Sequence, residues 1–363
     1  MGVHAFTWGD DYTEAFINLP WQIYPNKYHW VPPIKLSLQM ELSPQNLFFR
    51  HGEAQPFVFV RDEQVIGRIV ASFDNLLSQS DDEIVGHFGY FECVNDVDVA
   101  MSLLSAAEEW LKVKGVTSVH GPVNLSVFTG YRLQTVGFDT PAFMGEPRSP
   151  DYYIDLLFAA GYQEHASWYS WEFSVETTSV KLKRNKKMVQ SMRDKGDQYR
   201  VQSITKEKFF EELPAIYDVG MKAFSNNYGY SDIDYEEFKQ VYLPLYQLMI
   251  DGSFYKSVSP EGNVVGFVYG FPDVAPAFNE IDGDFSRMSV LDDFQPTALV
   301  YMNFGLLQEH RGCSSVYDFG IQLTGLAVQM GWYGYGALVK EGSSIYNSMG
   351  DWNRKYSVFS KSQ

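Results

Sequence analysis

Residues that can move a proton occur at the ends of strand-like stretches in the first third of the chain. Glu92 ends one such stretch, in Phe91-Glu92-Cys93. A partly buried carboxylate there would have a raised pKa suited to a general base, and the alternative is a structural hydrogen bond to a neighbouring strand. His87 and His120 lie on neighbouring strand candidates and could face one cleft, although lone histidines of this kind are more often hydrogen-bonded core residues.

No other catalytic motif competes with these residues. The sequence contains no Gly-x-Ser-x-Gly elbow, no phosphate loop ending in Gly-Lys-Ser/Thr and no His-Glu-x-x-His helix. Cys93 and Cys313 lie far apart without paired-ligand spacing, so we expect neither a disulfide framework nor a metal site. Because no secretory signal and no apolar run of about 18 residues is present, we expect a cytoplasmic protein without a transmembrane segment.

The charge of the chain argues against one class of partner. Its formal net charge is −17, and an acidic protein repels phosphate backbones, so we expect no nucleic acid. One local segment is basic and contains Lys181, Lys183, Arg184, Lys186, Lys187, Arg193 and Lys195. It is interpreted either as a solvated linker helix or as a docking patch for a phosphate-bearing partner such as an acidic carrier protein.

The elements that must position these residues occur twice along the chain. Strand-like pairs at 57–60 and 65–71 match pairs at 254–258 and 264–271, and each pair is followed by a further strand, at 86–93 and at 298–307. An amphipathic helix follows each of these strands, with Asn95 or Asp96 as the first N-cap and Ser314 or Ser315 as the second. The last strand of each unit is predicted at 116–120 and at 332–339.

The spacing of the two units supports a duplication. Val65 and Val264 are 199 residues apart, whereas Val119 and Gly336 are 217 apart. An inserted loop at 273–297 accounts for the difference. We therefore predict an α/β protein of two tandem domains, 1–180 and 201–363, each a mixed twisted sheet flanked by helices and joined by a basic linker at 181–200. The strand–helix–strand step should be a parallel crossover, with an anion site at the helix N-terminus.

This order of elements resembles the GNAT acyltransferase superfamily, and more closely a family of tandem GNAT-like proteins encoded by bacteria. Some of its members are linked to amide-forming acylation such as bacterial ceramide synthesis. In the first half the similar segments are Phe16-Ile17-Asn18-Leu19-Pro20-Trp21, Trp30-Val31-Pro32-Pro33, Asn46-Leu47-Phe48-Phe49, Gly67-Arg68-Ile69, His87-Phe88-Gly89-Tyr90-Phe91-Glu92, Gly121-Pro122-Val123-Asn124, Gly137-Phe138-Asp139, and Tyr152-Tyr153 ahead of Gly161-Tyr162. The second half is similar more loosely, through Asn226-Asn227-Tyr228-Gly229, Gly266-Phe267 and Pro272-Asp273.

The resemblance implies where an acyl-CoA would bind. In the superfamily an Arg or Gln precedes a Gly by three residues and a second Gly or Ala follows, so that backbone N–H groups hold the pyrophosphate. The first-half turn, Cys93 to Asp98, has no glycine and carries two carboxylates. The second-half turn keeps Arg311 but places Ser314 and Val316 at the small positions. The resemblance therefore assigns donor binding to Arg311, Gly312, Ser314 and Asn347.

The remaining roles also follow from the resemblance. Tyr346 is the candidate acid for the departing thiolate, and Glu92 is the candidate base. The acceptor cleft is assigned to His87, Asn124, Tyr152 and Tyr153. Each of these residues has an ordinary alternative in core packing or capping; the tyrosine pair, for example, could simply pack at a helix start.

The sequence thus predicts an N-acyltransferase that moves an acyl group from a thioester to a small-molecule amine. The co-substrate would be an acyl-CoA or an acyl carrier protein thioester, which makes a carrier protein a candidate partner. Two alternatives stay open. One is a catalytically degenerate GNAT-like binding protein. The other is a GNAT fold that carries out CoA-independent chemistry on a biosynthetic intermediate.

Overall fold

The computed structural model describes residues 1–24, 30–77, 83–343 and 345–363. Its strands form one mixed 13-stranded sheet in the order β1-β2-β3-β4-β5-β13-β7-β12-β11-β10-β9-β8, and β6 pairs with β13 beside this path. The strands are β1 (Gly2–Ala5), β2 (Gly52–Arg61), β3 (Gln64–Asp74), β4 (Val85–Cys93), β5 (Ser118–Gly121), β6 (Leu133–Val136), β7 (Gln163–Phe173), β8 (Arg200–Ser203), β9 (Phe254–Val258), β10 (Val264–Pro272), β11 (Ala298–Leu306), β12 (Tyr333–Lys340) and β13 (Arg354–Ser362).

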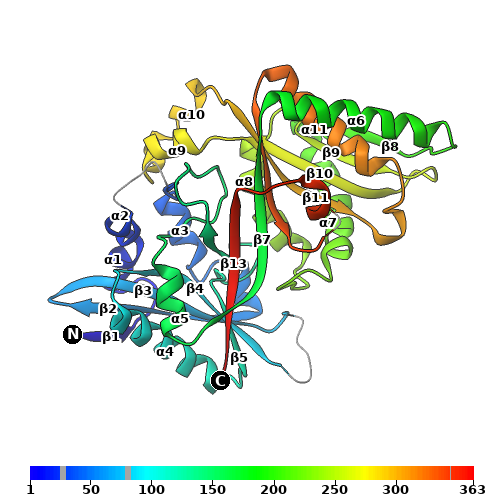
Figure 1. The fold of residues 1–363 in the computed structure, drawn as a ribbon. Helices are drawn as coiled ribbons and strands as arrows, with labels where there is room; N and C mark the ends of the chain where they lie inside the picture. Colours follow the sequence, from blue (N-terminus) through cyan, green and yellow to red (C-terminus); the bar gives the residue numbers. More distant parts are fainter. Residues whose placement is uncertain (25–29, 78–82, 344) are drawn as a thin grey trace.

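Helices flank this sheet (Figure 1). The α-helices are α1 (Tyr12–Asn18), α2 (Pro20–Ile23), α3 (Lys35–Glu41), α4 (Val97–Val113), α5 (Tyr153–Ala159), α6 (Val175–Arg193), α7 (Phe209–Phe224), α8 (Tyr235–Leu248), α9 (Ala275–Ile281), α10 (Val290–Asp293), α11 (Ser315–Met330) and α12 (Tyr346–Met349). Short 3-10 turns lie at Leu47–Arg50, Lys206–Lys208, Phe285–Arg287 and Gln308–His310.

The predicted repeat is present. The hairpin β2–β3, strand β4, helix α4 and strand β5 correspond in order to β9–β10, β11, α11 and β12. Both crossovers are parallel, since β4 pairs with β5 and β11 pairs with β12 in that sense. The stretch at 273–297, expected to be an inserted loop, instead carries α9 and α10.

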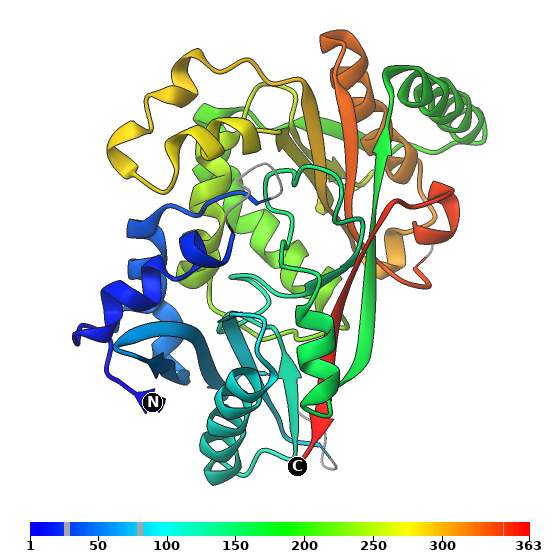
Figure 2. The same cartoon turned by 60° about the vertical axis from the view of Figure 1, so that its left-hand side comes forward.

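The two halves of the chain, called here the N-terminal half (1–180) and the C-terminal half (181–363), exchange strands. The last strand, β13, lies between β5 and β7, with Phe359 opposite Gly121. Strand β7 in turn pairs with β12, where Trp171 lies opposite Gly336. Figure 2 shows β13 in red running beside β7 in green. One continuous sheet therefore joins the halves, and the boundary expected at 181–200 stays a prediction.

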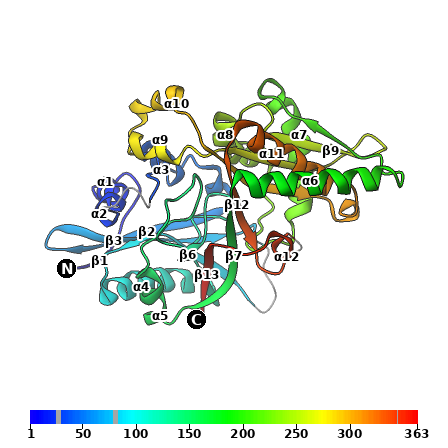
Figure 3. The same cartoon turned by 45° about the horizontal axis from the view of Figure 1, so that its top comes forward.

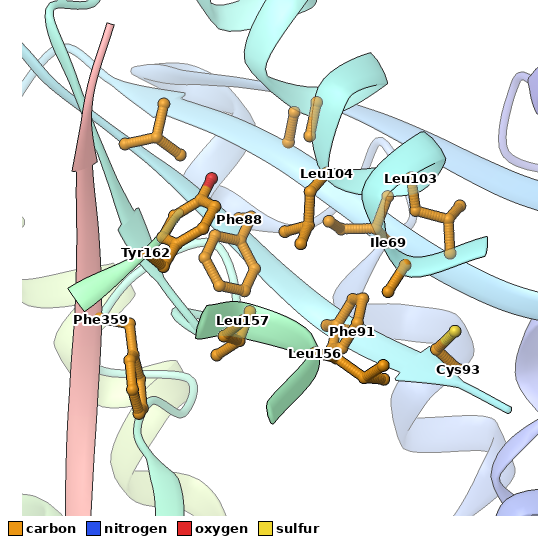
Figure 4. Close-up of a cluster of buried hydrophobic side chains, with 14 of the residues drawn as sticks. Ile69, Phe88, Phe91, Cys93, Leu103, Leu104, Leu156, Leu157, Tyr162 and Phe359 are labelled. Atoms are coloured by element: carbon orange, nitrogen blue, oxygen red, sulfur yellow. The ribbon is translucent and has the colours of Figure 1, made fainter. Parts of the chain in front are cut away.

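The core of the N-terminal half shows the consequence of this exchange. Helix α4 buries an apolar stripe on the sheet, and Asp96 caps its N-terminus as predicted. Phe359 from β13 is fully buried in the same cluster (Figure 4). Burying an aromatic ring contributes roughly 2–3 kcal/mol, so the end of the chain helps to hold the first half together.

The basic segment forms most of helix α6, which lies along α11 (Figure 3). Arg193 donates to the Asp318 carboxylate at 3.0 Å. Asn185 is buried against Gly320, where a Cβ atom would lie 2.4 Å from the amide nitrogen. The outer face of α6 exposes Lys183, Arg184, Lys186 and Lys187. The segment is thus a helix with one packed face and one cationic, solvent-exposed face.

Candidate functional site

The first candidate site is the place where β4 and β5 should diverge, and it is closed. The two strands pair as far as His87 opposite His120. Beyond that point Val123 N–H donates to the carbonyl oxygen of Phe88 at 2.7 Å. Tyr90, which has a φ of +49°, donates its N–H to Asn124 Oδ1 at 2.7 Å. Asn124 Oδ1 thus accepts a backbone hydrogen bond, and the role of Asn124 in substrate binding stays a prediction.

A carboxylate also occupies the helix N-terminus beside this closed strand pair. Asp96 accepts hydrogen bonds from the N–H groups of Asp98 and Val99 at 3.0 and 3.3 Å. Arg61 donates to the same carboxylate at 2.8 Å and lowers the pKa of Asp96. The chain thus supplies its own anion where a phosphate would otherwise meet the helix dipole.

At the corresponding place in the C-terminal half the two strands stop pairing, and this strand edge is called open here. Among the described residues, β11 pairs with β12 from Ala298 opposite Tyr333 to Tyr301 opposite Gly336. Strand β12 pairs with β7 from Gly334 opposite Phe173 to Lys340 opposite Trp168, so it stays with β7 where its pairing with β11 ends. The pairing of β11 with β10 skips Met302, which marks a bulge at the point of divergence. The edge of β11 beyond Tyr301 faces the gap between the diverging strands.

The turn that precedes α11 holds three predicted donor-binding residues together. Arg311 and Gly312 are exposed, and Arg311 Nε donates to the Leu306 carbonyl oxygen at 3.4 Å. Ser314 is buried and donates from both its N–H group and its hydroxyl to Asp197, at 2.9 and 2.5 Å. Asp197 therefore holds the position of an anion at the N-terminus of α11. Its partner lies 117 residues further along the chain, so no local pattern reveals this contact.

The other two residues expected at this site lie on α12. Tyr346 is half-buried, and its ring packs against Tyr169 and Trp171 at centroid distances of 5.0 and 5.9 Å. Asn347 is exposed, and its N–H donates to the Ser343 carbonyl oxygen at 3.2 Å. Within the described residues, no hydrogen bond or ring contact joins α12 to the turn before α11.

Glu92, Tyr152 and Tyr153 lie together near the end of β4. Tyr153 donates its hydroxyl to Glu92 Oε2 at 2.7 Å and accepts the N–H of Cys93 at 2.9 Å. Tyr152 donates to the Cys93 carbonyl oxygen at 2.8 Å. Burial raises the pKa of Glu92, and the positive charge of Arg68, 3.7 Å away, opposes that shift. These bonds match the structural alternative for Glu92 and leave its general-base role a hypothesis.

Sequence reasoning missed the rest of this buried cluster. Arg68 donates to the Phe16 carbonyl oxygen at 2.6 Å and lies 4.7 Å from the Phe16 ring centroid. On its other side Tyr90 donates to Glu41 at 3.0 Å. Burial raises the pKa of Glu41 to about 7, and the Tyr90 hydrogen bond and the Arg68 charge oppose that shift. Arg68, a charged residue inside the apolar strand predicted at 65–71, was the sequence feature that could have indicated this buried cluster.

The two histidines face each other across β4 and β5, as expected. His87 is buried, and burial with the neighbouring His120 lowers its pKa to about 4. His120 contacts the Tyr228 hydroxyl through Nδ1 and the Ser118 hydroxyl through Nε2, both at 3.0 Å. His120 thus connects the sheet of the N-terminal half to the C-terminal half, which is a structural role for at least one of the pair.

A cavity of about 150 Å³ lies beside the bulge in β11. No sequence signal pointed to it, because its walls come from both halves. They comprise Val127, Phe128, Gly220, Met221, Phe224, Tyr230, Phe238, Val241, Tyr242, Tyr269 and Asn303. The cavity lies beside the strand edge at which β11 and β12 stop pairing.

The architecture is the tandem GNAT fold. A solved tandem GNAT protein from the clavulanic acid biosynthesis pathway matches 99% of this chain and 98% of its own, with a TM-score of 0.57 at 10% identity. Two curated proteins are more similar in sequence, each 27% identical over 74% of this chain. They are Protein YghO of Escherichia coli K12, of which 68% is covered, and the bacterial ceramide synthase of Caulobacter vibrioides, of which 70% is covered. No model of a protein family matches the chain.

Two further observations concern the described residues alone. None of their helices is both long and apolar enough to span a bilayer. No group of three or more His, Cys, Asp or Glu side chains among them is arranged to hold a metal ion.

Proposed function

We propose that this protein is an N-acyltransferase whose reaction takes place at the open strand edge of the C-terminal half. The tandem GNAT fold and the similarity to a protein named ceramide synthase support acyl transfer as the class of reaction. The location of the reaction is inferred from a difference in strand pairing between the two halves. Val123 and Asn124 close the gap after β4, whereas β11 and β12 diverge after Tyr301.

In this proposal the amine of the acceptor attacks the carbonyl carbon of an acyl thioester. The C–N bond forms, the C–S bond breaks, the amine loses a proton and the thiolate takes one up. Backbone N–H groups at the edge of β11 beyond Tyr301 polarise the carbonyl oxygen as negative charge develops on it. Tyr346, which is half-buried on α12, remains the proposed acid that protonates the thiolate. Substitution of Tyr346 by phenylalanine tests this role of its hydroxyl.

The donor is an acyl thioester carried by CoA or by a carrier protein. Asp197 disfavours a CoA pyrophosphate at the N-terminus of α11, because it already takes the hydrogen bonds of Ser314. The exposed cations of α6, which packs against α11, support an acidic carrier protein as the bearer of the thioester. The acceptor is a small-molecule amine.

A second candidate function rests on the same aspartate. If the Asp197 carboxylate keeps its hydrogen bonds to Ser314 in the presence of a donor, the chain is a GNAT-like binding protein that has the fold but no donor site. The two candidates differ in what a transfer assay detects.

The experiment offers acyl-CoA and acyl carrier protein with a panel of amines, and mass spectrometry measures the amide product. We expect Arg311→Ala to lower kcat/KM at least tenfold, because Arg311 is the exposed cation in the turn before α11. Arg61→Ala is the matched control, since Arg61 serves the closed half through Asp96, and it should retain activity. An absence of amide product with both donors supports the binding protein, and loss of activity in Arg61→Ala alone contradicts the location.

A further inference from the structure

The cavity beside β11 is built almost entirely from apolar and aromatic side chains. Helices α7 and α8 supply one wall, through Met221 and Phe224 on α7 and Phe238 on α8. The N-terminal half supplies Val127 and Phe128. The cavity exists only where both halves meet.

No carboxylate, ammonium or guanidinium group is among the described residues that line the cavity. Its polar side chains are those of Asn303, Tyr269, Tyr242 and Tyr230. Asn303 Nδ2 donates to the Tyr269 hydroxyl at 2.9 Å, and Tyr242 hydrogen-bonds with Asn303 and Tyr269. The Tyr230 hydroxyl donates to Asp232 at 3.2 Å. Burial raises the pKa of Tyr242 to about 12 and raises the pKa of Tyr269 well above its usual value. The walls are therefore uncharged at every physiological pH.

An uncharged wall decides which part of a substrate can enter. Transferring an ammonium group from water into such a site without a partner costs far more than a hydrogen bond returns. An alkyl or phenyl group instead gains roughly 25 cal/mol for each Å² of apolar surface that it buries. The cavity thus favours an apolar group over the amine end of an acceptor.

The volume sets the size of that group. An apolar cavity of about 150 Å³ is large enough for a benzene-sized molecule, and this cavity measures about 150 Å³. A straight chain of about six carbon atoms has a similar volume. A chain of sixteen carbons does not fit unless the walls move.

The position of the cavity connects it to the reacting strand. Asn303 lines the cavity, and it follows Met302 directly, the residue that forms the bulge where β11 leaves β12. A carbonyl group at the strand edge would therefore lie next to the cavity.

We propose that this cavity binds the acyl chain of the donor and selects acyl groups of about six carbons or a phenyl ring. This inference rests on the proposed acyl transfer at β11 and adds to it the class of acyl group.

The first test measures binding without any reaction. Methyl-¹³C methionine NMR follows the methyl resonance of Met221, assigned with Met221→Leu, while benzene and then benzylamine at pH 7 are added. We expect benzene to shift this resonance and protonated benzylamine to leave it unchanged. Val241→Phe should fill the cavity and weaken benzene binding at least tenfold. Leu243→Phe, which introduces the same ring at a 46% exposed position of α8, should bind benzene as the wild type does.

The second test measures chain length. N-acetylcysteamine thioesters of six and sixteen carbons carry no phosphate, so they separate the acyl pocket from the phosphate site. We expect the wild type to prefer the six-carbon thioester at least tenfold, and Val241→Ala to shift that preference towards longer chains. The absence of a Met221 shift with benzene, or an unchanged chain preference in Val241→Ala, overturns the assignment. If benzene binds but no thioester reacts, the cavity stands and the proposed acyl transfer fails.

Discussion

Removal of the Asp197 carboxylate should convert the N-terminus of α11 into a site that binds CoA. Asp197 accepts two hydrogen bonds from Ser314 and one from the Tyr199 N–H at 3.1 Å. Asp197→Ala frees the N–H and hydroxyl of Ser314 for a phosphate oxygen. It also removes a negative charge from the place that the phosphate would take.

The structure sets the size of this effect. Two unit charges about 4 Å apart repel by roughly 4 kcal/mol at an effective dielectric of 20. Asp197 is half-exposed, so solvent screening reduces the repulsion to about 1–2 kcal/mol. Since 1.4 kcal/mol corresponds to a factor of ten, Asp197→Ala should tighten CoA binding roughly five- to thirtyfold. The lost hydrogen bonds should destabilise the fold by about 1 kcal/mol.

Isothermal titration calorimetry with CoA at low and high salt measures this prediction. The gain in affinity should shrink as salt rises, because both the repulsion and the phosphate attraction are screened. Asp96→Ala is the matched control, since Asp96 occupies the other helix N-terminus, beside a closed strand pair. We expect no gain in that variant.

One result would refute the reasoning. If folded Asp197→Ala, with a Tm within a few degrees of wild type, binds CoA no better than wild type, the turn before α11 is not a phosphate site. An equal gain in Asp96→Ala would show instead that only the net charge of the protein had changed.

Three further substitutions probe the buried clusters. Glu41→Gln should raise stability at pH 8 by up to about 3 kcal/mol, because folding raises the pKa of Glu41 from 4.5 to about 7. The protonated Glu41 carboxyl therefore stabilises the fold fully below pH 4.5, and this stabilisation is lost as the pH rises through 7. Urea titrations at pH 4.5 and 8 measure the difference. Tyr153→Phe should cost about 1–3 kcal/mol by thermal or urea unfolding, because the buried N–H of Cys93 loses its acceptor. Arg354→Met should cost about 3–5 kcal/mol in urea, because Glu146 is then buried without its cation.

Matched controls separate burial from chemistry in these three cases. Glu53→Gln removes an exposed carboxylate that pairs with Lys114 and should change stability by less than about 1 kcal/mol at both pH values. Tyr152→Phe removes a half-buried hydroxyl, so it should cost less than Tyr153→Phe. Lys355→Met breaks a more exposed pair on the same strand as Arg354. If it costs as much as Arg354→Met, the buried ion pair is not the cause.

The elements that local patterns specify could be predicted from the sequence. The hairpin 57–71, the strand 86–93 and the stripe of α4 have clear periods and turn residues, and the structure confirms them. The Asp96 cap could be predicted because a capping side chain acts within three residues of itself. The exchange of β13 into the first half could not, because strand pairing at long sequence separation leaves no local periodicity.

The same reason limits the prediction of the site. The residue types in the turn before α11 predict a donor site there, and that site stays a prediction. Asp197, which accepts the hydrogen bonds of Ser314 at this turn, comes from a separate part of the chain. The cavity walls come from α7, α8, two strands and the segment that contains Val127. A sequence shows which side chains are apolar, and only the tertiary arrangement shows where they leave a space.

The two halves share one fold but differ in what they can do. In the N-terminal half the segment after β5 fills the gap beside β4, and the same segment then continues to Phe128, which reaches the cavity of the C-terminal half. Closing the first strand pair and completing the second cavity are thus parts of one local arrangement. A substitution that opens the first gap, such as Asn124→Ala, should therefore also disturb the cavity wall, with little CoA binding gained in the first half because Asp96 still occupies its helix N-terminus.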